Sequence, residues 1–201
     1  MRITNMPTPT RIEAQKVTGL TTLVGKTGGI RDLPKFMAAV AEVPDGSTII
    51  LDWSRIDLAT ASYFGAAIVP IIRMTMIGDL DRYFVFAGLD QTSLDELKLV
   101  IEYNHLVIFL GDLDRGGGVR NLRVLGKLES PYLETLTAIQ SAKSASASGL
   151  HKQQDRIGTR IGKTGWVNRL SHLHRLRLVK KHKVGRELVF ETVQKGDPNG
   201  R

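Results

Sequence analysis

Residues 164–190 read TGWVNRLSHLHRLRLVKKHKVGRELVF. This stretch has the clearest pattern of secondary structure in the chain. In its first half the apolar residues Trp166, Leu170, Leu173 and Leu176 recur at helical spacing. After Val179 the period changes, a basic run surrounds a Val184-Gly185 tip, and residues 187–190 have the composition of a returning strand. The sequence therefore predicts a helix, with Thr164 as its N-cap, followed directly by a basic β-hairpin.

Positive charge is concentrated in the same part of the chain. The whole sequence has 28 Lys and Arg against 20 Asp and Glu, a formal net charge of +8. Residues 1–120 hold 12 basic and 14 acidic side chains, whereas residues 121–201 hold 16 and 6, so the two parts have net charges of −2 and +10. This asymmetry indicates a polyanionic partner; a basic face kept for solubility is the alternative.

The segment from Leu125 to Val193 resembles bacterial winged-helix regulators. The resemblance depends on the helix at 165–173, its continuation at 176–179 and the basic run at 180–186. It implies a winged helix-turn-helix that binds duplex DNA, with one helix in the major groove and the hairpin on the neighbouring backbone. It does not imply a particular target sequence.

This resemblance and the residue types together predict two sets of DNA contacts. Arg and Lys pair with guanine and Asn pairs with adenine, so we expect groove contacts from Lys163, Thr164, Asn168, Arg169 and His172. On the hairpin we expect phosphate contacts from Lys181, Lys183 and Arg186. Trp166 should pack in the core, and Arg175 and Arg177 should be solvated or paired with acids.

The front part of the chain alternates short apolar strands with helical patterns. The predicted buried strands are 48–51, 83–87 and 106–110, with helices between them, which is typical of an α/β domain. Glycines and acids in the next segment indicate a linker. We therefore expect four parts: an α/β domain at 1–113, a linker at 114–124, a winged-helix domain at 125–195 and a tail at 196–201.

Residues 48–65, TIILDWSRIDLATASYFG, are similar to the STAS domain of anti-sigma factor antagonists and to related STAS-like domains. The resemblance implies a small STAS-like α/β sandwich that covers about residues 12–110. It also places Ser62 where antagonists have a serine that a partner kinase phosphorylates, although Thr60, Ala61 and Tyr63 depart from that motif. Ser62 is thus a candidate phospho-acceptor, and the alternative is an ordinary helix N-cap.

Several classes of function lack their sequence signatures. There is no cysteine for disulfides or thiolate metal sites, and no apolar run is long enough to cross a bilayer. Two Gly-Lys-Thr triplets, at 25–27 and 162–164, lack the earlier glycine of a phosphate-binding loop. No nucleophile, base and acid occur in a recognisable pattern. We expect a cytoplasmic protein that is not an enzyme and has neither metal nor cofactor.

These observations predict an α/β fold in which a STAS-like sandwich precedes a winged-helix (α+β) domain. The function that we expect is a DNA-binding transcriptional regulator, acting as a homodimer, whose front domain senses a signal or mediates assembly. One alternative is a protein-interaction switch in which the STAS-like domain binds a kinase or a sigma-regulating partner. Another is binding of duplex RNA by shape.

Overall fold

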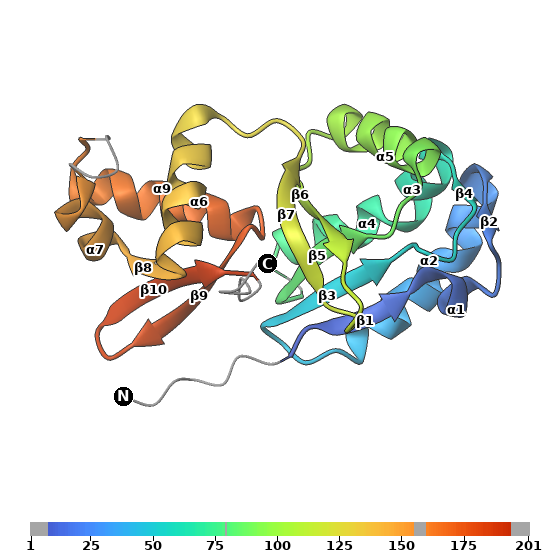
Figure 1. Ribbon diagram of the computed structural model, residues 1–201, viewed down its shortest axis with the longest axis horizontal. Coiled ribbons are helices and arrows are strands. Elements are labelled where there is room, and N and C mark those ends of the chain that lie inside the picture. The colour runs from blue at the N-terminus through green and yellow to red at the C-terminus, as the bar shows by residue number, and fades with distance from the viewer. Residues whose placement is uncertain (1–7, 79, 155–159, 194–201) are drawn as a thin grey trace. The chain divides into compact units, whose positions relative to one another are not determined.

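The computed structural model describes residues 8–78, 80–154 and 160–193, and the chain divides after Lys127 into two compact units (Figure 1). The N-terminal unit is built on a five-stranded sheet of order β1-β3-β5-β6-β7. Its strands are β1 (Thr10–Glu13), β3 (Ser47–Asp52), β5 (Arg82–Ala87), β6 (Ile108–Leu113) and β7 (Val119–Leu125). The first four are parallel and β7 is antiparallel to β6. The predicted α/β class is thus confirmed.

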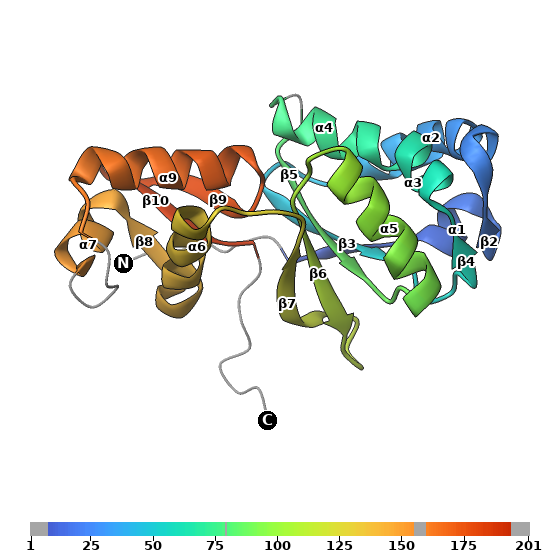
Figure 2. The same cartoon turned by 90° about the horizontal axis from the view of Figure 1, so that it is seen from above.

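The helices of this unit lie on one face of the sheet. They are α1 (Ala14–Thr18), α2 (Gly25–Ala41), α3 (Ala61–Ala67), α4 (Val69–Met76) and α5 (Gln91–Tyr103), and a short parallel pair, β2 (Thr22–Leu23) with β4 (Leu58–Ala59), adjoins them. The strands are added to the sheet in chain order and in one direction. Right-handed crossovers then place every connecting helix on the same side, and Figure 2 shows α2, α3 and α4 together there.

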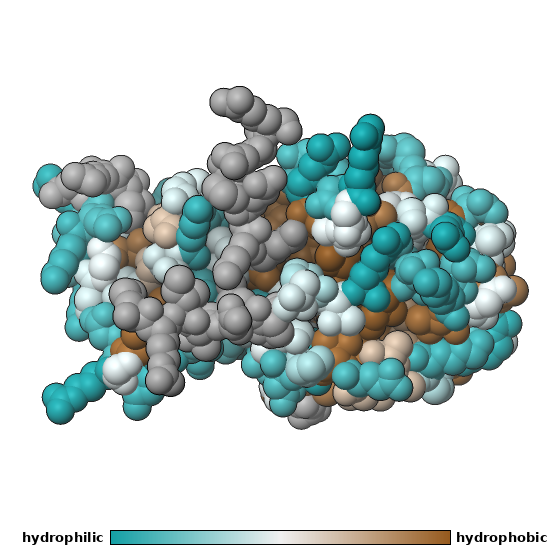
Figure 3. All heavy atoms as spheres, turned by 60° about the horizontal axis from the view of Figure 1, so that its bottom comes forward, coloured by the Kyte–Doolittle hydropathy of each residue, from teal (hydrophilic) through white to brown (hydrophobic). Residues whose placement is uncertain are grey.

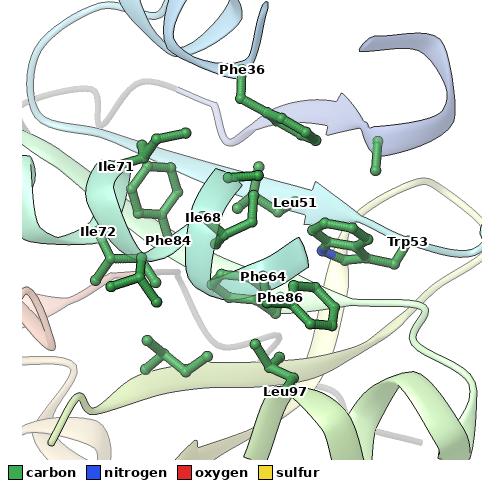
Figure 4. Close-up of a cluster of buried hydrophobic side chains, with 14 of the residues drawn as sticks. Phe36, Leu51, Trp53, Phe64, Ile68, Ile71, Ile72, Phe84, Phe86 and Leu97 are labelled. Atoms are coloured by element: carbon green, nitrogen blue, oxygen red, sulfur yellow. The ribbon is translucent and has the colours of Figure 1, made fainter. Parts of the chain in front are cut away.

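The core between helices and sheet is centred on Trp53, immediately after β3. Its ring lies 4.9 Å from the ring of Phe64 on α3, 6.1 Å from Phe36 on α2 and 6.5 Å from Phe86 on β5, measured between centroids (Figure 4). All four side chains are buried. Residues from the sheet and from all five helices of the unit therefore share one hydrophobic cluster, which fixes the helices against the strands.

Helix α2 begins earlier than its sequence suggests. Asp32 followed by Pro34 has the composition of a helix N-terminus, but both residues lie inside α2. Asp32 is fully buried and accepts hydrogen bonds from Arg31, from Lys35 and from the Tyr63 hydroxyl of α3, at 2.7–3.1 Å. These donors, the Arg31 guanidinium foremost, lower the pKa of Asp32 to about 2. Asp32 therefore joins α2 to α3 rather than starting a helix.

Glycine allows α2 and α3 to approach closely at a second point. A Cβ atom added to Gly29 would lie 2.7 Å from the Ala66 Cβ and 2.7 Å from the Tyr63 carbonyl oxygen. Such distances are too short for any larger residue without a shift of the backbone. The two helices are consequently held together by a tight contact as well as by the Asp32 hydrogen bonds.

The segment predicted as a linker is mostly part of the sheet. Residues 114–118 form the turn of the β6–β7 hairpin, in which the Asp114 carboxylate accepts hydrogen bonds from the amides of Gly116 and Gly118. Glycines and acids fit a tight turn as well as they fit a linker, which explains the wrong prediction. The tail predicted at 196–201 lies outside the part of the chain that the structure describes.

The C-terminal unit has helices and a small antiparallel sheet. Its described elements are α6 (Ser130–Ala142), β8 (Ser144–Ser146), α7 (Ala147–Lys152), α9 (Lys163–Arg175), β9 (Val179–Val184) and β10 (Glu187–Thr192). The strand order is β8-β10-β9. Its buried apolar residues include Leu136, Ile139, Leu150, Trp166, Leu170, Leu173, Val179 and Phe190. Each of the three described helices and both long strands thus contribute buried apolar side chains to this unit.

One detail of this unit differs from the expectation: the N-cap of α9 is Gly162, not Thr164, so Thr164 lies in the first turn of the helix. The Ser- and Ala-rich segment before it contains β8 and then the short helix α7, whose N-cap Ser146 accepts a hydrogen bond from the Gly149 amide.

Candidate nucleic-acid interface

Helix α9 has a buried face and an outward face. Trp166, Leu170 and Leu173 are completely buried and define the inner side. Directly opposite them, at a spacing of four, three and four residues, are the exposed side chains of Thr164, Asn168, Ser171 and Arg175. This outward face is about 16 Å long at 1.5 Å per residue, and a B-DNA major groove is wide enough to admit a helix.

Of the five predicted groove contacts, three are exposed on α9 and two are not. Lys163, Thr164 and Asn168 are exposed. Arg169 is directed instead toward α6: its Nη1 lies 3.4 Å from the Pro131 carbonyl oxygen and 3.8 Å from the Glu134 carboxylate. Its guanidinium also lies 5.7 Å from the centroid of the Trp166 ring, and only 17% of the side chain is exposed. Arg169 therefore helps to join two helices.

His172 also faces α6. Its ring stacks on Tyr132 with centroids 4.0 Å apart, and its Nδ1 accepts a hydrogen bond from Arg175 at 2.9 Å. Burial lowers the pKa of His172 below its ordinary value, and the neighbouring Arg175 guanidinium lowers it further. The imidazole is consequently neutral at pH 7 and adds no charge for phosphate binding. The prediction that His172 faces outward is wrong, because its ring packs on Tyr132 of α6.

Two residues outside the predicted groove contacts also lie on the outward face. Ser171 and Arg175 are both exposed on the same side as Asn168, and for Arg175 this agrees with the expectation that its side chain is solvated. Val167 is exposed beside them, although it is apolar. Counting from Thr164 in steps of four and three residues would have found the polar pair, because the buried Trp166 fixes which side of the helix faces inward.

The basic hairpin is a two-stranded ribbon with a two-residue turn. Val184 pairs with Glu187 across the turn, and Gly185 has φ +60°, which glycine adopts without steric cost. Lys181, Lys183 and Arg186 are all exposed, as predicted. Lys181 and Lys183 lie two residues apart on β9 and therefore project from the same face of the ribbon, so they can contact one phosphate backbone together. By contrast, Lys180 is buried.

The charge of this region is of one sign. Nine Lys and Arg residues and no Asp or Glu occur between Arg160 and Arg186. Glu187 and Glu191 follow on β10, and Glu191 lies 3.5 Å from His182. The acids of the hairpin thus begin only after its tip. A surface of this composition attracts a polyanion and repels acids from its own chain.

Ser62, the candidate phospho-acceptor, lies in the first turn of α3. The N-cap of α3 is Thr60, so Ser62 is not the cap. The Ser62 hydroxyl is exposed and lies 3.2 Å from the Thr60 hydroxyl, which accepts a hydrogen bond from the Gly25 amide. The Glu96 carboxylate already accepts a hydrogen bond from the Ala61 amide at 2.6 Å. A phosphate at Ser62 would meet this negative charge, so the local geometry does not favour it.

Ser93 and Glu96 have the spacing of a capping box, but they do not cap α5. Asp90 caps this helix by accepting hydrogen bonds from the amides of Thr92 and Ser93. The Ser93 hydroxyl instead accepts from the Ala59 amide of β4 at 2.8 Å. Both side chains therefore hold α5 against the start of α3.

Within residues 8–78, 80–154 and 160–193 there is no group of three or more His, Asp or Glu side chains that could hold a metal ion, and no helix there is long and apolar enough to span a membrane. Comparisons of the chain with protein-family models, with curated proteins and with solved structures find no match.

Proposed function

We propose that the chain is a DNA-binding transcriptional regulator whose C-terminal unit is a winged helix-turn-helix. In this proposal α9 lies in the major groove of duplex DNA and the β9–β10 hairpin is the wing on the adjacent backbone. Thr164, Asn168, Ser171 and Arg175 face the base edges. Lys181, Lys183 and Arg186 contact phosphates.

The order of elements supports this proposal. The described elements occur in the order α6, β8, α7, α9 and the β9–β10 hairpin. In the sheet, β10 lies between β8 and β9. A winged helix has this succession, in which the last helix before the hairpin is the one that reads DNA. The topology alone is compatible with other functions, so the proposal depends on the surface as well.

The observation that carries the proposal is a coincidence of geometry and charge. The polar side of α9 lies directly opposite its buried Trp166 face, and the hairpin that follows it presents exposed cations without an acid before Glu187. A helix with a free polar side and a basic ribbon at its end are the two parts that groove reading and phosphate contact need.

The N-terminal unit is proposed to sense a signal or mediate assembly, in keeping with its resemblance to STAS domains. Its singly wound sheet has no point at which the strand order reverses, which is where α/β sheets usually bind a nucleotide. We further propose that the protein acts as a homodimer, because paired half-sites strengthen the binding of a small winged helix.

Titration of the affinity for duplex DNA against salt tests the function. We expect log Kd to rise linearly with log salt concentration, with a slope of about 0.9 for each phosphate contacted. The affinity is measured first with a pool of fluorescent duplexes of random sequence. It is then measured with the individual duplexes that the protein selects from that pool. If the affinity does not change between low and physiological salt, the proposal is wrong.

Two further measurements separate the alternative partners. Duplex RNA of the same length should compete less well than duplex DNA, because the deep, narrow major groove of A-form RNA excludes a helix. Nucleic acid that copurifies and is removed by high salt supports DNA binding. A stoichiometric acidic protein in place of nucleic acid would favour an interaction switch instead.

A further inference from the structure

Arg175, on the outward face of α9, is held by another side chain of the same helix. Its Nη2 donates a hydrogen bond to Nδ1 of His172, 2.9 Å away and three residues earlier. A guanidinium group has five N–H donors, so four remain for a second partner. Because Arg175 is exposed, its side chain stays accessible to a ligand while His172 holds it.

His172 is itself fixed by helix α6. Its ring stacks on Tyr132 with centroids 4.0 Å apart and planes 24° apart. Tyr132 lies in the first turn of α6, where its amide donates to the Glu129 carbonyl oxygen at 2.9 Å. A ring packed against another ring has few alternative rotamers, so α6 determines where Nδ1 lies. The position of Arg175 therefore depends on a second helix and not on α9 alone.

The hydrogen bond to Arg175 requires a neutral imidazole, because only an unprotonated ring nitrogen can accept. Burial lowers the pKa of His172 most, the Arg175 guanidinium lowers it further, and Glu129, the N-cap of α6, acts in the opposite direction with less effect. Tyr132 presents a ring face to the imidazole rather than a charge. At neutral pH the ring accepts from Arg175, and protonation replaces this hydrogen bond with repulsion between two cations.

We infer that His172 is a positioning residue for DNA recognition: it holds the Arg175 guanidinium in place for a bidentate contact with a guanine in the major groove. The inference rests on the proposed function and adds to it a guanine opposite the C-terminal end of α9. Arginine pairs with the O6 and N7 atoms of guanine more often than any other specific contact is made. A side chain that is already ordered loses less rotamer freedom on binding, so His172 affects affinity without touching DNA.

Two substitutions separate the hydrogen bond from the packing of the ring. His172→Phe keeps a ring against Tyr132 but removes the acceptor, whereas His172→Asn keeps an acceptor close to the position of Nδ1 but removes the ring. The full-length variants are titrated by fluorescence anisotropy at neutral pH, with a duplex that the protein selects and with the random-sequence pool. Affinity for the pool depends on phosphate contacts, so it also reports whether each variant is folded.

His172→Phe should bind the selected duplex about tenfold more weakly than the wild type and should bind the pool equally well. His172→Asn should bind both like the wild type. The reverse ranking would mean that His172 acts through packing alone and would overturn the inference, as would a His172→Phe that binds the selected duplex with full affinity.

A pH titration gives a readout that a purely structural role would not change. For the wild type, the preference for the selected duplex over the pool should fall about tenfold between about pH 7.5 and about pH 5. Affinity for the pool should hold or increase, because an imidazolium adds positive charge. His172→Asn keeps every other histidine, so its preference should stay constant. A wild-type preference that does not change, or one that falls equally in His172→Asn, would contradict the inference.

Arg175→Ala identifies the base. Each guanine of the selected duplex is replaced in turn by an analogue that lacks the N7 acceptor. At one position the wild type should lose affinity about tenfold and Arg175→Ala should lose none. Adding His172→Phe to Arg175→Ala should weaken binding no further, because both substitutions remove the same contact. If no guanine shows this coupling, Arg175 does not read a base and the inference is wrong.

The proposed function and this inference fail in different ways. Binding to duplex DNA that does not depend on salt would remove both. A steep salt dependence, together with equal affinity of the wild type, His172→Phe and Arg175→Ala for the selected duplex, would leave the regulator intact and remove only the positioning role of His172.

Discussion

The two units use their charged side chains differently. In the N-terminal unit the acids and bases are paired with one another: Asp32 with Arg31, Asp52 with Arg11, and the buried Arg82 with Asp45. In the C-terminal unit the exposed cations of α9 and the hairpin have few acids near them, and the few that occur come late on β10. Charged side chains thus form ion pairs within the fold of the first unit, whereas many cations of the second are exposed to solvent. On the face drawn in Figure 3, the N-terminal unit (right) shows hydrophobic residues beside hydrophilic ones.

Trp166→Ala should have the largest effect and should separate the two units most clearly. The indole is fully buried, and its nitrogen has no hydrogen-bond partner in the described structure, so the loss is one of packing. We expect a cost of about 3–5 kcal/mol in the stability of the C-terminal unit. Calorimetry should show that one unfolding transition moves to lower temperature while the other stays in place. Equal shifts of both transitions would mean that the units unfold together.

Gly29→Ala should destabilise the N-terminal unit by about 1–3 kcal/mol, because the new methyl group overlaps Ala66 and the Tyr63 carbonyl oxygen. The matched control is Gly65→Ala in α3, where an added Cβ would have no atom within 4 Å. That variant should be neutral or more stable by up to about 1 kcal/mol. Chemical denaturation measures both; a harmless Gly29→Ala would contradict the tight α2–α3 contact.

Asp32 should make the stability of the N-terminal unit depend on acid. Its pKa is lowered from 3.8 to about 2 in the folded protein, so the stabilisation is complete above the unfolded value and is lost as the pH falls toward 2. We expect a loss of about 2 kcal/mol over this range. Asp32→Asn removes the titrating group. The difference between the wild type and this variant, in the free energy of unfolding plotted against pH, gives the contribution of Asp32. Parallel curves would show that Asp32 does not contribute.

Lys183→Ala should have the smallest effect, and only on the C-terminal unit. If Lys183 contacts a phosphate, the slope of log Kd against log salt should fall by about 0.9, equally for all DNA sequences. Lys26→Ala, which removes an exposed cation from the N-terminal unit, is the control with the same net charge. A variant that changes the preferred sequence rather than the slope would place Lys183 at a base.

Most of the fold could be predicted where a local pattern determines it. The apolar strands around Ile49, Phe84 and Ile108 and the helix around Trp166 are recognisable from their periods alone. The start of α2 and the cap of α5 were not, because Asp32 and Ser93 have the composition of caps but bond to residues 31 and 34 positions away in the chain. Tertiary partners of this kind leave no local signal.

The candidate site could be predicted less well than the fold. Lys181, Lys183 and Arg186 were identified correctly as exposed, because a two-residue turn fixes which hairpin residues are at the tip. On α9 the residue types indicated base readers, but the sequence did not show which of them pack against a neighbouring helix. Arg169 and His172 have the chemistry of base readers, yet the neighbouring α6 supplies a carbonyl and a tyrosine ring that hold them. Chemistry alone does not show which side of a helix is free.

The strand order of the large sheet also bears on how the protein is made. Because β1, β3, β5, β6 and β7 are neighbours in that sequence, each new strand joins the outer edge of those already paired. No strand has to be inserted between two earlier ones, and every pairing in this sheet joins a strand to the one added just before it. A chain that leaves the ribosome from its N-terminus can therefore assemble this sheet progressively during synthesis, with only one open edge waiting for the next strand.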